Sequence, residues 1–212
     1  MRSGKRDDGS TAIIVANGNY PRHPLPLSVI EQAPYIVCCD GAANHFIEAG
    51  GSPDAIVGDC DSISFENRIR FADRIFPDGE QESNDLTKSV RFCLERGRKN
   101  IVIVAGTGLR EDHTLGNISL LADYQVEANV KMITDYGIFT PIRSRTTFHS
   151  FAGEQVSLFS IDRKPITTTG LKYPIVNRVL DNWWQGTLNE SLGDSFTVDS
   201  CGKVIVFQVF GC

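Results

Sequence analysis

The sequence predicts an α/β N-terminal domain with a mostly parallel sheet covered by helices, followed by a C-terminal all-β sandwich or barrel domain. Short apolar runs alternate with stretches of helical periodicity from residue 12 to about residue 135, and this periodicity disappears after about Pro141. Of the 212 residues, 41% are hydrophobic and 22% are charged, which is typical of a globular protein. We expect a disordered N-terminus over residues 1–10, the α/β domain over 11–140 and the β domain over 141–212.

Five short apolar runs in the first part are predicted to be buried strands. They are bounded by Gly, Pro, Asn or Asp, as strands usually are. The runs cover residues 12–16, 35–39, 55–57, 101–105 and 130–134. Their alternation with helical segments implies a mostly parallel sheet covered by helices.

Three helices are expected between these strands, over residues 42–49, 85–96 and 113–123. In the second of them, four apolar residues share one face, Ser83 or Asn84 is placed to cap the start, and Gly97 follows the end. In the C-terminal part, residues 156–161 and 204–210 are rich in β-forming residues and the intervening chain is punctuated by glycines. This pattern favours a small antiparallel sandwich or barrel.

The formal net charge of −5 argues against a general nucleic-acid or membrane-surface binder, since both favour basic faces. No apolar run approaches the roughly 20 residues that span a bilayer, and the first ten residues lack the apolar core of a signal peptide. The six cysteines form no CxxC pair and no zinc-like set with histidine. We therefore expect a cytoplasmic protein with no nucleic-acid or membrane partner.

Acidic residues follow the predicted strands. Asp40 follows the run 35–39, Asp59 and Asp61 follow the run 55–57, Asp85 opens a helix, and Asp112 follows the loop 106–110. The carboxyl ends of strands in an open α/β sheet share one edge, so these carboxylates should converge there. Two carboxylates about 4 Å apart repel by roughly 4 kcal/mol at an effective dielectric of 20, so such a cluster needs a cation or raised pKa values. Oxygen ligands without a Cys/His set favour a hard cation, most simply Mg²⁺.

Each aspartate also has a simpler interpretation as a helix cap or turn residue. For Asp85 or Asp112 alone, a helix cap is the better interpretation. Asp40 and Gly41 could simply form a turn with no further role. The pair Asp59 and Asp61 is harder to explain in this way, because capping needs one carboxylate. Together the residues favour a metal site.

The loop after the fourth predicted strand suggests phosphate contact. Its glycines Gly106 and Gly108 precede Arg110, whose guanidinium can bind a phosphate through two hydrogen bonds. Lys88 could face a phosphate or be solvated, and His113 could contact substrate or only occupy the first helical turn. The GxxxxGK[ST] pattern is absent, which excludes a P-loop at the motif level.

Five stretches, taken in order, resemble the thiamine pyrophosphokinase family. They are DGAAN at 40–44, GDCDS at 58–62, NDLTK at 84–88, GTGLREDHTLGN at 106–117 and, in the β part, TGLKYP at 169–174. The resemblance covers about residues 12–210. Any one motif is weak, but the ordered set in an α/β half followed by a β half is highly specific.

The sequence departs from the family pattern at four motif positions. Ala42 replaces a glycine, Cys60 a phenylalanine, Asn84 a threonine, and Leu109 the second glycine of a Gly-Gly-Arg element. None of these changes removes a carboxylate or the arginine. The family's late Ser-Asn element has no clean counterpart in residues 190–196.

The resemblance implies Mg²⁺-dependent transfer of the pyrophosphoryl group of ATP to the hydroxyl of thiamine, giving thiamine diphosphate and AMP. It implies that Asp59, Asp61 and Asp85 bind Mg²⁺ and that Asp40 and Asp112 complete the acidic catalytic cluster. The expected contacts of ATP and its phosphates are Gly41, Asn44, Lys88, Gly106, Thr107, Gly108, Arg110, His113 and Asn117. The expected contacts of thiamine are Leu171, Lys172, Tyr173, Ser191 and Ser195, with Trp183 or Trp184 nearby.

In the family, the thiamine site lies between two subunits, so the resemblance also implies a homodimer. Two other functions remain open at this point. A Mg²⁺-dependent phosphohydrolase would use the same acidic edge with water as the nucleophile, and a non-enzymatic protein would bind thiamine or nucleotide without turnover.

Overall fold

The computed structural model describes residues 8–211, so the expectation of a disordered N-terminus falls largely outside the described residues. The chain divides into two compact units. The first runs to Leu120 and includes Val126–Asp135, and the second comprises Leu121–Gln125 and the chain from Tyr136 onward. Within the described residues, no helix is both long and apolar enough to cross a membrane.

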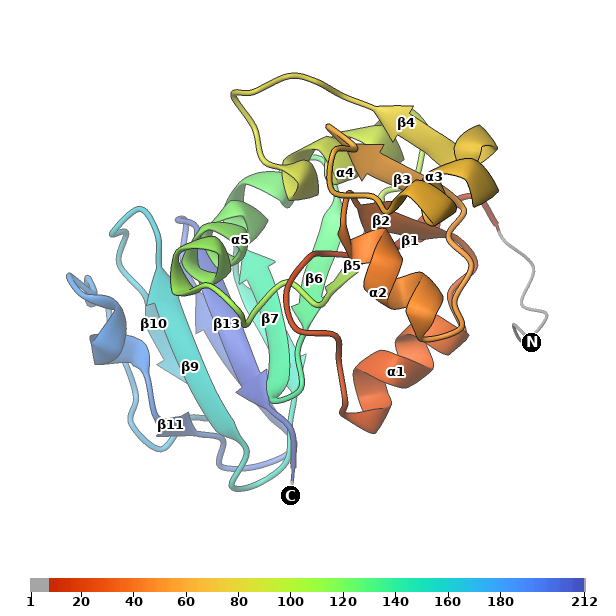
Figure 1. The fold of residues 1–212 in the computed structure, drawn as a ribbon. Helices are drawn as coiled ribbons and strands as arrows, with labels where there is room; N and C mark the ends of the chain where they lie inside the picture. The colour runs from red at the N-terminus through yellow and green to blue at the C-terminus, as the bar shows by residue number, and fades with distance from the viewer. Residues whose placement is uncertain (1–7, 212) are drawn as a thin grey trace. The chain divides into compact units, whose positions relative to one another are not determined.

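The first unit is an α/β fold (Figure 1). Its elements in chain order are β1 (Thr11–Val15), α1 (Pro24–Glu31), β2 (Ile36–Cys39), α2 (Ala42–Glu48), β3 (Ala55–Gly58), α3 (Phe65–Arg70), the 3₁₀ helix η1 (Ala72–Arg74), β4 (Ile75–Pro77), α4 (Asp85–Glu95), β5 (Asn100–Val104), α5 (Glu111–Tyr124) and β6 (Asn129–Ile133). The last four residues of α5 belong to the second unit. All five predicted strands are present, and α5 begins two residues earlier than expected.

The strands of the first unit form a sheet in the order β6-β5-β1-β2-β3-β4, and every pair within it is parallel. The four residues from Ala12 to Val15 are all buried, which explains the unbroken apolar run of a strand covered on both faces. From β1 the chain moves outward through β2, β3 and β4, and then returns to β5 on the other side of β1. The crevice between the loops after β1 and β5 is therefore the topological switch point, where open α/β sheets bind ligands.

Helix α4 follows the expected pattern of capping and packing. The side chain of Asn84 accepts a hydrogen bond from the backbone N–H of Thr87 at 2.9 Å, which satisfies one of the free donors at the helix start. The apolar face carries Leu86, Val90 and Cys93, all buried, and the helix packs against β1, β2 and β3. Because Asn84 caps the helix, Asp85 is free to act at the adjoining sheet edge.

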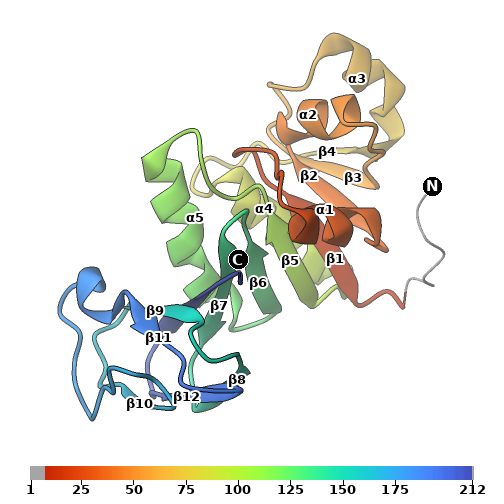
Figure 2. The ribbon, with the colours of Figure 1, turned by 90° about the horizontal axis from the view of Figure 1, so that it is seen from below.

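The second unit is an antiparallel β sandwich. Its strands are β7 (Gly137–Ile142), β8 (Thr146–His149), β9 (Gln155–Ser160), β10 (Thr167–Thr169), β11 (Asn189–Glu190), β12 (Ser195–Asp199) and β13 (Val204–Val209), with the 3₁₀ helix η2 at Trp183–Gly186. One sheet has the order β11-β9-β13-β7 and the other β10-β12-β8, and Figure 2 shows the second as a separate layer.

A single apolar core joins the two sheets of the sandwich. Val156 and Leu158 from β9 contribute to the same buried cluster as Phe196 and Val198 from β12, and the rings of Phe148 and Phe196 stack with centroids 5.0 Å apart. The burial of alternate residues along these strands is what two packed antiparallel sheets require. The predicted fold class, α/β followed by antiparallel β, is confirmed.

Candidate functional site

Three carboxylates gather at the carboxyl ends of β2 and β3. Asp40 follows β2, while Asp59 and Asp61 follow β3, and one oxygen from each lies within 4.8 Å of the others. The two strands are parallel neighbours, with Cys39 opposite Val57, so the residues that follow them meet at one edge. Their mutual repulsion, several kcal/mol at such distances, would be relieved by a bound cation, so the group is a candidate cation site.

Asp40 provides the test of whether a metal ion fits this group. Its side chain is only 4% exposed, and among residues 8–211 its Oδ1 has no hydrogen-bond partner. A buried carboxylate oxygen without a partner is costly unless a bound group compensates it. Asp40 also has a left-handed backbone, with φ of 40°, as residues at functional sites often do. The donor set therefore fits a hard cation.

Cys60 lies between Asp59 and Asp61 but does not add an anionic ligand. Burial raises the pKa of its thiol to about 11, with Asp40 adding to the effect. The protonated Sγ donates to the carbonyl oxygen of Gly58 at 3.3 Å. Oxygen atoms are thus the anionic donors of the group at neutral pH, which favours a hard cation over zinc.

Gly58 allows Asp85 to reach the same edge. Its φ is +152°, and a Cβ placed on it would lie 2.9 Å from both the Cβ of Asp40 and Oδ1 of Asp85. Any other residue at this position would push one of the two aspartates away. Asp85 is therefore close to Asp40, although the compact group of three carboxylates does not include it.

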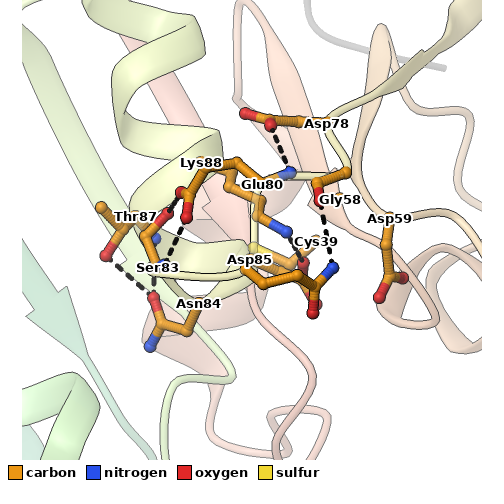
Figure 3. A network of polar contacts seen from close by, with 12 residues as sticks. Cys39, Gly58, Asp59, Asp78, Glu80, Ser83, Asn84, Asp85, Thr87 and Lys88 are labelled. Carbon is orange, nitrogen blue, oxygen red and sulfur yellow. Dashed lines mark hydrogen bonds and ion pairs between the residues drawn. The ribbon is translucent and has the colours of Figure 1, made fainter.

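Asp85 and Lys88 form an ion pair next to the acidic group (Figure 3). Nζ of Lys88 lies 3.6 Å from Oδ1 of Asp85, and the lysine side chain is only 3% exposed. Burial raises the pKa of Asp85, Lys88 opposes this shift, and Asp40 and Asp59 reinforce it. The ammonium group of Lys88 is thus held next to the acidic group, where it can also bind an anionic ligand.

The segment between β4 and α4 is held by a network of its own side chains (Figure 3). The carboxylate of Glu80 accepts hydrogen bonds from the backbone N–H groups of Glu82 and Ser83 and from the hydroxyl of Ser83. Arg91 on α4 donates to Asp78 at 2.8 Å. These contacts give the segment a defined shape next to the site.

A cavity of about 420 Å³ lies at the switch point. Its lining comes from the loops after β1 and β5, from the segment before α4 and from the starts of α4 and α5. The lining residues are Ala16, Asn17, Gly18, Cys39, Asp59, Gln81, Ser83, Asn84, Asp85, Leu86, Lys88, Gly106, Gly108, Leu109, Arg110, His113 and Asn117. Eight of the expected site residues, separated by up to 58 positions in the chain (59 to 117), thus face one space.

The glycine loop after β5, residues 106–110, is hydrogen-bonded to α5 and to the loop after β1. Asn117 donates from Nδ2 to the carbonyl of Gly106 at 2.9 Å, and the hydroxyl of Thr114 accepts from the N–H of Gly108 at 3.1 Å. On the other side, the N–H of Asn19 donates to the carbonyl of Thr107 at 2.9 Å. The loop is therefore shaped before any ligand arrives.

Leu109 lies in this loop with a φ of 65°, in the left-handed region. A left-handed non-glycine residue costs roughly 1–2 kcal/mol, and the side chain is 69% exposed, so packing does not offset this cost. We expect Leu109→Gly to raise the free energy of unfolding by about 0.5–1 kcal/mol, after allowing for the greater freedom of glycine in the unfolded chain. Urea denaturation measures the change.

Leu192→Gly is the matched control, because Leu192 is similarly exposed, at 61%, and is not among the residues with positive φ. This variant should lower the free energy of unfolding. Equal effects of the two substitutions would contradict the explanation from backbone strain.

Arg110 and Asp112 are joined by two hydrogen bonds, from Nε at 3.1 Å and from Nη2 at 2.5 Å. Both side chains are exposed. The guanidinium, together with the backbone N–H of His113, lowers the pKa of Asp112 to about 2. In this structure Asp112 therefore pairs with Arg110 and is outside the compact acidic group.

Two further residues expected at the ATP site, Gly41 and Asn44, do not line the cavity. The side-chain amide of Asn44 instead bonds to the backbone of the loop that carries Asp59 and Asp61. Thr107 contributes its backbone carbonyl to Asn19 and is also absent from the lining.

The residues expected to contact thiamine have different surroundings in the second unit. Leu171 belongs to the apolar core, Ser191 is 1% exposed with its hydroxyl bonded to that of Ser150, and Lys172 pairs with Glu190 at 2.9 Å. Tyr173 is 61% exposed and lines a cavity of about 580 Å³.

Arg178, Trp184 and Asn189 also line this second cavity. The other four residues expected to contact thiamine do not line it: Leu171, Lys172, Ser191 and Ser195. Ser195 is exposed at the start of β12.

Two groups of lining residues were not predicted from the sequence. Asn17 and Gly18 line the first cavity because β1 neighbours β5 in the sheet, and this strand order cannot be read from a single sequence. Gln81 and Ser83 line it because of the network around Glu80. For the first group, the Asn-Gly pair directly after the first predicted strand was a usable signal.

The chain matches two family models. Residues 27–134 match the model described as "Thiamin pyrophosphokinase, catalytic domain", and residues 137–207 match "Thiamin pyrophosphokinase, substrate-binding domain". The matched segments together cover most of both units.

Individual relatives agree with these matches. The chain is 28% identical over 206 residues to thiamine pyrophosphokinase 1 of Oryza sativa subsp. japonica, and the alignment covers 81% of this chain and 76% of the relative. It is 30% identical over 188 residues to thiamine pyrophosphokinase of Bacillus subtilis, covering 79% and 82%. The crystal structure of thiamine pyrophosphokinase from Bacillus subtilis has a similar fold, with a TM-score of 0.80 at 23% identity over 96% of this chain and all of the other.

Proposed function

The chain belongs to the thiamine pyrophosphokinase family, and from that premise we propose that the 420 Å³ cavity at the switch point is its ATP and metal site. The enzyme transfers the pyrophosphoryl group of ATP to the hydroxyl of thiamine, giving thiamine diphosphate and AMP. Its small-molecule substrates are ATP and thiamine.

The observation that carries the proposed site is the acidic group with its buried oxygen. Asp59 belongs both to this group and to the cavity lining, and Oδ1 of Asp40 has no partner among the described residues. We propose that Asp40, Asp59 and Asp61, with Asp85 beside them, hold Mg²⁺. Bound there, the ion would neutralise the charge of the ATP phosphates.

The basic side chains of the cavity are suited to the phosphates of ATP. Lys88 presents a buried ammonium group beside Asp85, and Arg110 retains its Nη1 donors while Nε and Nη2 bind Asp112. Backbone N–H groups of the glycine loop add donors near the start of α5. These groups position the phosphate chain so that AMP can leave as the new bond forms.

In the transfer step, the hydroxyl oxygen of thiamine forms a bond to the β-phosphorus of ATP. The bond between this phosphorus and the oxygen that bridges to the α-phosphate breaks, and AMP leaves with that electron pair. The hydroxyl proton passes to one of the carboxylates at the edge. The work of the protein is mainly orientation and charge neutralisation.

We propose that thiamine is held by the second unit, around Tyr173 and Trp184, which line the 580 Å³ cavity. Aromatic faces suit the thiazolium cation. We also propose that the enzyme is a homodimer, since the second unit exposes the large apolar side chains of Tyr173, Trp184, Leu188 and Leu192, and the first three line one cavity. Sedimentation equilibrium measures the assembly state.

A cytoplasmic location is proposed because Cys39, Cys60 and Cys93 are buried free thiols, which suits a reducing compartment.

Nucleotide product analysis tests the function directly. The protein is incubated with ATP and Mg²⁺, with and without thiamine, and the nucleotides are separated. AMP should form only with thiamine, in equal amount to thiamine diphosphate. Release of ADP or phosphate regardless of thiamine would reject the proposal, and EDTA should abolish the reaction.

A further inference from the structure

The side-chain amide of Asn44 joins helix α2 to the loop that carries Asp59 and Asp61. Its Nδ2 donates to the carbonyl oxygen of Ser62 at 2.9 Å, and its Oδ1 accepts from the backbone N–H of Ser64 at 3.0 Å. The amide therefore uses its donor and its acceptor on the backbone of one segment, which fixes that segment against the helix.

The start of α2 fits closely against the same segment. A Cβ placed on Gly41 would lie only 3.0 Å from the Cβ of Ser62, so the backbone directly after Asp40 is in close contact with the loop. Asn67 of α3 donates from Nδ2 to the same Oδ1 of Asn44 at 3.0 Å, which holds the amide in one orientation.

A second side chain holds the preceding part of the loop. Arg68 on α3 donates from Nη2 to the carbonyl oxygen of Cys60. The backbone carbonyls of Cys60 and Ser62 are thus both bound by protein groups, whereas the carboxylates of Asp59 and Asp61 remain exposed at the edge.

We propose that Asn44 is a positioning residue that sets the distance between Asp40 and the pair Asp59 and Asp61, and thereby the affinity of the acidic group for its cation. Asn44 does not line the cavity, and its polar atoms are bonded to the loop, so it acts through the carboxylates instead of touching ATP. The inference rests on the proposed assignment of these carboxylates to the metal.

A titration with Mn²⁺ in the absence of nucleotide, followed by electron paramagnetic resonance of the free ion, tests this role on the full-length protein. Loss of a residue that orients metal ligands typically lowers metal affinity 10–100-fold. We expect Asn44→Ala to weaken Mn²⁺ binding by about tenfold. Weakening by less than about threefold would overturn the proposal.

Asn44→Asp separates geometry from charge and serves if the alanine variant does not fold. The new carboxylate keeps the acceptor for Ser64 but loses the donor to Ser62. Because added negative charge attracts a cation, charge alone predicts tighter Mn²⁺ binding, whereas displacement of the loop predicts weaker binding. We expect weaker binding, and an increase in affinity would overturn the proposal.

Two further proteins complete the experiment. The control variant Asn129→Ala loses an exposed amide that is hydrogen-bonded to Asn100 on β5. It should bind Mn²⁺ as the wild type does. Asp59→Asn should bind much more weakly, which tests the metal site itself. If Asp59→Asn binds as the wild type does, the metal assignment fails and this inference with it. If Asp59→Asn loses binding and Asn44→Ala does not, only the role of Asn44 is overturned.

Discussion

Replacing Asp59 with asparagine is expected to lower kcat/KM for ATP by at least about a hundredfold. Loss of a residue that only supports a metal ligand already lowers metal affinity or activity 10–100-fold, and loss of a ligand should have a larger effect. Asp59 is both a member of the acidic group and a lining residue of the cavity. The neutral amide keeps the shape of the side chain but removes the charge that attracts the cation. Steady-state rates measured over a range of Mg²⁺ concentrations should also show a higher requirement for the ion.

Asp73→Asn makes the same chemical change away from the site. Asp73 lies on η1 with its side chain 81% exposed, and it does not line the cavity. Its kcat/KM should stay within about twofold of the wild type, as is usual for surface substitutions. If Asp59→Asn retained wild-type rates and the wild-type response to Mg²⁺, the proposed metal site would be wrong.

Replacing Lys88 with methionine is expected to lower kcat/KM about a hundredfold at neutral pH and to move the acid limb of the pH profile to higher pH. The expected loss in rate follows from removal of the buried positive charge that we propose faces the phosphates, an effect of about 10²–10³ for one preorganised group. Methionine is similar in length and suits the buried environment, so the fold should persist.

The direction of the pH shift follows from the pKa of Asp85. Burial raises this pKa and Lys88 lowers it, so removing the lysine raises it further. Because the proposed metal site needs Asp85 ionised, the variant should lose activity at a higher pH as the solution is acidified. Full pH profiles of kcat/KM measure the shift, with Lys99→Met as the control for loss of an exposed lysine. An acid limb at the same pH as in the wild type, or at a lower pH, would contradict the proposed coupling between Lys88 and Asp85.

The parts of the fold that were predictable are those with a large apolar face. The buried strands β1, β2, β3, β5 and β6 and the amphipathic helix α4 produce clear patterns, because packing demands them. Helix α3 has no buried residue, and β4 has three residues, none fully buried. Such elements leave no periodic signal, so their presence cannot be predicted from the sequence.

The candidate site was predictable to the extent that strand ends converge. This rule brought Asp40, Asp59 and Asp61 together, and it also indicated the glycine loop after β5. It says nothing about how side chains pair with each other. Arg110 binds Asp112 and Asn44 binds a neighbouring loop, and both choices depend on distances that only the folded chain defines.

Asp40 combines two local costs, a left-handed backbone and a buried oxygen without a partner among the described residues. A substitution that relieves both costs would also remove a carboxylate of the proposed metal site. A stabilising change at a position outside the acidic group, such as Leu109, would leave these carboxylates unchanged, so the stability of the fold and the affinity for the cation can be altered at separate residues.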